Sequence, residues 1–84
     1  MNTPDWLKKR GGELEKGYDG RSIYFSINKQ PQYRLRVISV DGQFGCAIMQ
    51  TNNSKSVPCE AKAASEDAAL SAGVEELKKY LGWE

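Results

Sequence analysis

Apolar and polar residues alternate through the middle of the chain, which is the pattern of strands with one buried face. The alternation predicts strands at Ser22–Ile27, Tyr33–Val40 and Gln43–Thr51. Asp41-Gly42 separates the last two, and both residues accept the positive φ angles of a two-residue type I′ turn. Residues 28–32 are expected to form a five-residue hairpin loop. The pattern therefore predicts a three-stranded antiparallel meander.

These two reversals set which residues face each other. The expected pairs are Val37 with Cys46, Leu35 with Ile48, Phe25 with Leu35, Ile23 with Val37, Tyr24 with Arg36, and Ser26 with Arg34. In this register the apolar residues of all three strands share one face of the sheet. A shift of one residue in either hairpin would turn one apolar set outward, so the agreement favours this register.

Two helices are expected to flank the meander. Thr3-Pro4-Asp5 is typical of a helix start and predicts a short helix over residues 4–10, anchored by Trp6 and Leu7. Residues 11–21 are expected to form a loop. Ser65 is a good N-cap for a second helix over residues 66–81, which Gly82 ends. Its apolar stripe consists of Leu70, Val74, Leu77 and Leu81.

The predicted fold is α+β, in the order α-β-β-β-α, with the C-terminal helix packed on one sheet face and a short helix at the N-terminus. The 84 residues are expected to form one small domain, 1–84. Trp83 is expected to fold back over the end of the second helix. Residues 56–61 fit either a fourth short strand at an edge or a loop, because they contain Pro58.

The composition restricts the chemistry. The chain has two cysteines and no histidine, so we expect no metal site and no cofactor. The carboxylates form no obvious catalytic pair, and we expect no enzymatic activity. An apolar run long enough for a membrane helix is absent from the sequence, as is a basic-then-apolar signal segment, so a cytoplasmic location without membrane association is expected. Cys46 is expected to be a buried packing residue and Cys59 a loop thiol.

Two groups of residues are candidate binding sites. The outer sheet face is expected to carry Tyr24, Arg34, Arg36 and Met49, and an aromatic ring between guanidinium groups can stack a base or hold a phosphate. The same residues also fit an ordinary solvated face with a cation–π pair. The second group is the basic run Lys8, Lys9 and Arg10, which could contact a nucleic acid or an acidic partner, or could simply compensate the helix dipole. The net charge of +1 argues against strong generic binding to phosphate backbones.

Ile38 and Val40 favour a different interpretation, in which the outer face binds a protein partner. They are expected on the outer face, where either Trp6 and Leu7 of the first helix cover them or they stay exposed. An exposed apolar cluster beside arginines would suit a protein partner or a homodimer. The function predicted from the sequence is therefore a non-catalytic protein-interaction module, with a nucleic-acid-binding module as the alternative.

The α-β-β-β-α order and the segment Ser65–Leu70 resemble the layout of double-stranded RNA-binding domains. That family carries a lysine cluster at the start of its last helix, where this chain has Glu66 and Asp67. The resemblance therefore implies no binding residues here. The strand-strand-strand-helix unit is also similar to HicB-type antitoxin domains.

Overall fold

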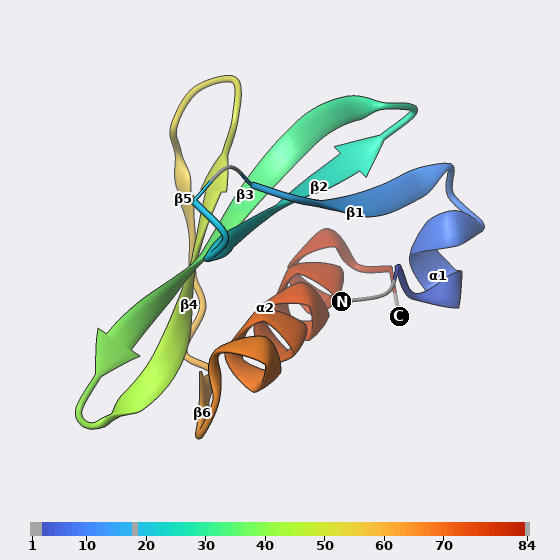
Figure 1. The fold of residues 1–84 in the computed structure, drawn as a ribbon. Coiled ribbons are helices and arrows are strands. Elements are labelled where there is room, and N and C mark those ends of the chain that lie inside the picture. The colour runs from blue at the N-terminus through green and yellow to red at the C-terminus, as the bar shows by residue number, and fades with distance from the viewer. Residues whose placement is uncertain (1–2, 18, 84) are drawn as a thin grey trace.

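The computed structural model describes residues 3–17 and 19–83, and it shows two helices on one side of an antiparallel sheet (Figure 1). The elements are α1 (Asp5–Lys8), β1 (Gly12–Lys16), β2 (Ser22–Ile27), β3 (Gln30–Val40), β4 (Gln43–Gln50), β5 (Ser56–Val57), β6 (Lys62–Ala63) and α2 (Glu66–Leu81). The strands run in the order β1-β2-β3-β4-β5, and β6 also pairs with β4. The predicted α+β class and the packing of α2 on the sheet are confirmed.

The turn between β3 and β4 forms where the sequence predicts it. Asp41 and Gly42 have φ angles of 49° and 77°, as a type I′ turn requires. The register places Val37 opposite Cys46 and Leu35 opposite Ile48, in agreement with the prediction.

The hairpin between β2 and β3 differs from the predicted one. Its turn is Asn28-Lys29, with φ angles of 50° and 66°, and β3 begins at Gln30. The five-residue loop is therefore wrong, because Asn28 tolerates the left-handed conformation without a glycine. Tyr24 faces Arg34 rather than Arg36. The other observed pairs on the regular part of this hairpin are Ile23 with Leu35, Phe25 with Tyr33 and Ser22 with Arg36.

A bulge explains why the apolar face is still the predicted one. A two-residue turn without a bulge would place Phe25 opposite Gln32, on the wrong face for its neighbours. The register shifts between Phe25 and Ser26, so that Phe25 faces Tyr33 and Ser26 faces Pro31. The extra residue on β3 moves the pairing by one position. From Ile23 to Phe25 the final register differs from the predicted one by two residues, which leaves each of these residues on the predicted face.

The predicted loop at residues 11–21 contains a strand. β1 pairs with β2, and Leu14 faces Phe25 across the ladder. The sequence pattern missed β1 because it has a single large apolar residue, and pairing with β2 determines its conformation. The predicted cap at Thr3 is also wrong: Pro4 precedes α1, and the Thr3 hydroxyl instead accepts a hydrogen bond from the Leu14 N–H at 3.1 Å.

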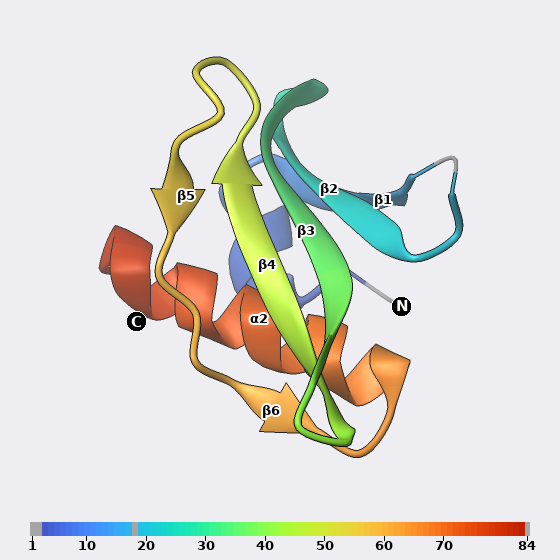
Figure 2. The ribbon, with the colours of Figure 1, turned by 90° about the vertical axis from the view of Figure 1, so that its left-hand side faces the viewer.

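The C-terminal helix matches the prediction closely. The Ser65 hydroxyl accepts a hydrogen bond from the Ala68 N–H at 3.2 Å, and Gly82 ends the helix with a φ of 73°. Figure 2 shows α2 crossing behind the sheet, while β5 and β6 lie along β4. Residues 56–61 thus include a two-residue strand, β5, followed by irregular chain. The buried core between the layers comprises Leu7, Ile23, Phe25, Leu35, Val37, Cys46, Ile48, Val57, Leu70, Val74 and Leu77.

Candidate functional site

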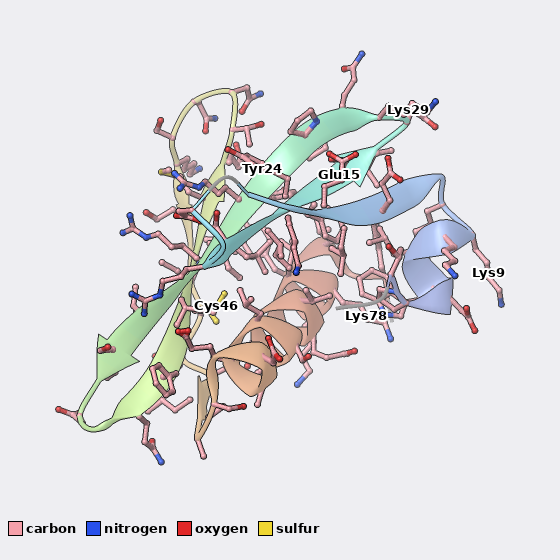
Figure 3. All side chains as sticks on the ribbon, viewed as in Figure 1. Lys9, Glu15, Tyr24, Lys29, Cys46 and Lys78 are labelled. Atoms are coloured by element: carbon pink, nitrogen blue, oxygen red, sulfur yellow. The ribbon has the colours of Figure 1, made fainter. Side chains whose placement is uncertain are left out.

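A row of mostly polar residues crosses the outer face of the sheet, the face away from α2. Successive strand pairings align Glu15, Tyr24, Arg34, Met49 and Ser56 from one edge to the other. Figure 3 shows Glu15 and Tyr24 on this side. The structure thus brings together the predicted outer-face residues, with an acidic side chain beside the tyrosine.

Arg34 is partly neutralised by a carboxylate. Its Nη2 atom lies 3.4 Å from Asp19 Oδ2. The Arg21 N–H and the Ser22 hydroxyl also donate to Asp19, at 3.0 and 2.9 Å, and these bonds hold the pKa of that carboxyl below its ordinary value. Arg34 Nε is buried and has no hydrogen-bond partner among the described residues.

Arg36 and Met49 border a shallow hollow on the same face. Its volume is about 200 Å³, and its lining comprises Arg34, Arg36, Ala47, Ile48, Met49 and Ser56. Arg36 is exposed and lies two residues from Arg34 on β3. A planar group could lie between the arginines and Met49, but Glu13 and Glu15 share this face and would repel a phosphate.

The basic run Lys8, Lys9 and Arg10 lies elsewhere. It belongs to α1 and the residues that follow, and α1 packs on the α2 side of the sheet (Figures 1 and 3). The two groups of candidate residues that the sequence suggested therefore do not form one continuous surface.

A cluster of four aromatic rings fills the space between α1, the β2–β3 hairpin and the end of α2. Phe25 is its centre: its ring centroid lies 6.2 Å from that of Trp6, 6.0 Å from Trp83 and 5.9 Å from Tyr33. Trp6 and Trp83 meet edge to face at 6.4 Å. These are ordinary separations for favourable aromatic pairs. Trp83 folds back from the end of α2 to complete the cluster.

An open groove lies against this cluster. We call it the aromatic groove; it has a volume of about 420 Å³, and its lining comprises Arg10, Phe25, Ile27, Gln32, Tyr33, Leu81 and Trp83. The Arg10 guanidinium carbon lies 4.8 Å from the centre of a Trp83 ring, and the Lys78 ammonium lies 5.3 Å from the centre of a Trp6 ring. The groove therefore combines apolar walls with fixed positive charge at its rim.

Ile38 and Val40 are neither covered by α1 nor fully exposed. Trp6 and Leu7 pack with the core on the other side of the sheet, so of the two alternatives left open by the sequence, cover by these residues does not occur. Ile38 and Val40 are half-buried and border a hollow of about 410 Å³ beside the irregular chain at residues 59–61 and Lys62 of β6. That chain lies where the sequence pattern left the alternatives of strand or loop open.

Sequence reasoning missed the aromatic groove. Its lining residues lie on β2, β3 and α2 and in the segments that follow the two helices, and Trp6 and Trp83 lie at opposite ends of the chain. The available signal was the presence of both tryptophans near helix ends, with a cation close to each in sequence.

In the chain from 3 to 17 and from 19 to 83, no three His, Cys, Asp or Glu side chains gather as a metal site would require. No helix in the same part of the chain is long and apolar enough to cross a membrane. Comparisons with models of protein families, with curated proteins and with solved structures found no match to this chain.

Proposed function

We propose that this protein is a non-catalytic interaction module that binds an acidic segment of a partner protein in the aromatic groove. The observation that carries the proposal is the pairing of the groove's aromatic walls with Arg10 at its rim. Tryptophan, tyrosine and arginine are the residue types that dominate binding energy in protein interfaces. A cytoplasmic location belongs to the same proposal and rests on the sequence alone.

The charges around the groove favour an acidic occupant. Arg10 lies on the Trp83 ring, an arrangement that leaves its N–H donors available at the edge of the guanidinium plane for a carboxylate. Lys8, Lys9 and Lys78 add positive charge on the same side of the sheet, and none of them makes an ion pair with another described residue. Among the described residues that line the groove, none is acidic.

The apolar walls favour an anchor side chain within that segment. Phe25 is fully buried, whereas Tyr33, Ile27, Leu81 and Trp83 are half-buried and still present apolar surface. An aromatic or aliphatic side chain of the partner would cover this surface and remove it from water. The expected ligand is therefore a short segment with one apolar anchor flanked by aspartates or glutamates.

Peptide selection tests this assignment directly. A phage library of random 12-residue peptides is selected on the immobilised protein, and a synthetic peptide, acetyl-Glu-Glu-Asp-Phe-Glu-Glu-Asp-amide, is titrated with tryptophan emission as the signal. We expect enrichment of acidic sequences with an apolar anchor. Binding of the synthetic peptide should weaken at least tenfold in Arg10→Glu, because the substitution reverses the charge at the rim.

Lys62→Glu is the matched control, since it makes the same charge change on β6, at the other end of α2. Its effect on the affinity should be below threefold. Enrichment of basic peptides, no enrichment at all, or equal losses in the two variants would contradict the proposal. If a second copy of the chain occupies the groove, the protein should sediment as a dimer. That result would contradict the assignment of an acidic partner protein to the groove.

A nucleic-acid-binding role is the second candidate, and the position of Tyr24 opposite Arg34, with Arg36 in the same hollow, favours it. The acidic residues on that face count against strong phosphate binding. The test is fluorescence anisotropy with a labelled 12-nucleotide single strand and a 16-base-pair RNA duplex at low salt. Binding that is lost in Arg34→Ala/Arg36→Ala would support this role, and no anisotropy change would remove it.

A further inference from the structure

The two cysteines lie beside each other, although twelve residues separate them in the sequence. Cys46 is on β4 and is 2% exposed, whereas Cys59 is half-buried in the irregular chain between β5 and β6. Both border the hollow next to Ile38 and Val40. The Cys59 thiol lies close enough to Cys46 to contribute to raising the pKa of that thiol, and Figure 3 shows a second sulfur atom next to that of Cys46.

We propose that Cys46 and Cys59 are a redox-active dithiol, which a hydroperoxide oxidises to an intramolecular disulfide that fastens the chain between β5 and β6 to β4. The proposal rests on this juxtaposition and is independent of the aromatic groove. Free cysteines near each other in space, one half-buried and one buried, have the arrangement of a peroxide-reactive thiol with its resolving partner.

Exposure sets the order of the steps. The half-buried Cys59 sulfur meets the oxidant first: its thiolate attacks one peroxide oxygen, the O–O bond breaks, and a sulfenic acid and hydroxide result. The Cys46 thiol then loses its proton, its thiolate attacks the Cys59 sulfur, the S–O bond breaks, and the departing hydroxide takes up a proton to become water. The two sulfurs together lose two electrons, hydrogen peroxide gains them, and the products are one disulfide and two waters.

The surroundings of Cys46 make the second step slow. Burial raises the pKa of Cys46 to about 12, and the neighbouring Cys59 adds to this effect. α2 covers the thiol closely: a Cβ added at Gly73 would overlap Cys46 Sγ. Because little Cys46 thiolate exists at neutral pH, disulfide formation should accelerate about tenfold for each unit of pH while this step limits the rate.

The segment that the disulfide would hold has few other attachments. β5 and β6 are two residues long each, and residues 58–61 between them lie outside the sheet. Closing the bond would fix this segment over the hollow that Ile38 and Val40 border. The oxidised state would therefore have a more rigid surface at this edge than the reduced state.

The test treats the reduced protein with excess hydrogen peroxide and follows it by intact mass, non-reducing tryptic mapping and thermal unfolding. We expect a mass loss of about 2 Da in a monomer. The map should show one linked peptide pair, 37–55 joined to 56–62, because trypsin cleaves after Arg36, Lys55 and Lys62. The Tm should rise by roughly 10–20 °C, since the bond closes a loop of 14 residues. Dithiothreitol should restore both the reduced mass and the original Tm.

Single-cysteine variants assign the roles. In Cys46→Ala, dimedone should label Cys59 after peroxide treatment, because no partner resolves the sulfenic acid. In Cys59→Ser, Cys46 should stay unmodified in the folded protein. Disulfide-linked dimers in place of the intramolecular bond, oxygen addition to wild type without the 2 Da loss, or a lowered Tm after oxidation would overturn the proposal. These wild-type results do not depend on whether either variant folds.

Discussion

Replacing Gly12 with alanine should detach α1 from the sheet. Gly12 is buried at the start of β1, and its φ is not in the left-handed region, so its backbone accepts alanine. The obstacle is space. The added Cβ would overlap Leu7 Cδ1 and lie 2.7 Å from Leu7 Cγ and 3.0 Å from Ile27 Cδ1. Because Leu7 Cγ is a branch point and not the flexible end of a side chain, Leu7 must move, and α1 moves with it.

The size of the effect has two bounds. Overpacking a tight site costs about 1–3 kcal/mol in the free energy of unfolding. Complete loss of the Leu7 contacts would cost about 2–5 kcal/mol, the usual range for Leu→Ala in a core, since Leu7 is 0% exposed. We therefore expect Gly12→Ala to cost about 1–3 kcal/mol, which corresponds to a decrease in Tm of roughly 5–20 °C for a domain of this size.

Urea unfolding and tryptophan emission measure this prediction together. The only two tryptophans, Trp6 and Trp83, both belong to the aromatic cluster, so a displaced α1 should shift the native emission to longer wavelength. Leu7→Ala provides the control, because it removes the side chain that the new methyl group would strike. In the Leu7→Ala background, Gly12→Ala should lower the free energy of unfolding by less than about 0.5 kcal/mol. An unchanged cost in both backgrounds would refute the steric explanation, as would a Gly12→Ala variant with wild-type stability and emission.

Three further substitutions test other parts of the structure. Gly73→Ala should lower the free energy of unfolding by about 1–2 kcal/mol in urea titrations, because the new Cβ would lie 2.9 Å from Cys46 Cβ. This cost should exceed the gain of about 1 kcal/mol that alanine brings to a helix relative to glycine. Net stabilisation would contradict this packing. Ser65→Ala should cost about 1 kcal/mol through loss of the N-cap hydrogen bond, and an unchanged urea midpoint would show that the cap is dispensable. Hydrogen bonds to the Asp19 carboxylate, of which the one from the Arg21 N–H has the largest effect, lower the pKa of Asp19 in the folded state. Ionised Asp19 therefore stabilises the fold above its unfolded pKa, and this stability is lost as the pH falls through the folded pKa. Between pH 5 and pH 2 the Tm of Asp19→Asn should therefore fall less than that of wild type, and parallel decreases would contradict the assignment.

The face of each central strand could be predicted from the sequence, whereas the partners in one hairpin could not. Asp41-Gly42 identifies both the position and the type of its turn, because few other dipeptides accept two positive φ angles. Asn28-Lys29 carries a weaker signal, since lysine seldom adopts that conformation. The bulge opposite Phe25 is an adjustment that burial demands after the turn forms. Alternation therefore predicts which side of the sheet a residue occupies more securely than it predicts the residue opposite.

Strand β1 shows where local pattern contains too little information. Gly-Glu-Leu-Glu-Lys has one apolar residue, and its glutamates and lysine are not typical strand residues. The chain becomes a strand because β2 offers an unpaired edge and Leu14 can pack on the inner face beside Phe25. Because β1 was not predicted, Glu13 and Glu15 were not placed on the outer face. These two residues change the charge that surrounds Tyr24. An error in one edge strand thus changed the chemistry expected of the candidate site.

The aromatic groove follows from a difference in length between the two layers. The 16 residues of α2 span about 24 Å at 1.5 Å per residue, whereas the 11 residues of β3 span about 36 Å at 3.3 Å per residue. One helix therefore leaves an end of the long hairpin uncovered, where Phe25 and Tyr33 face inward.

At that uncovered end the chain supplies Trp6 from α1 and Trp83 from beyond α2, and these two side chains cover Phe25 without closing the layer. Neither residue reveals this role by its local pattern, because the need for cover arises only once both layers have been assembled. What the two tryptophans leave open is the groove, and Arg10 lies at its rim because α1 must approach the sheet closely enough to bury Leu7. The position of the proposed binding site is thus a consequence of packing, while its preference for an acidic partner depends on the few cations that follow Leu7 in the chain.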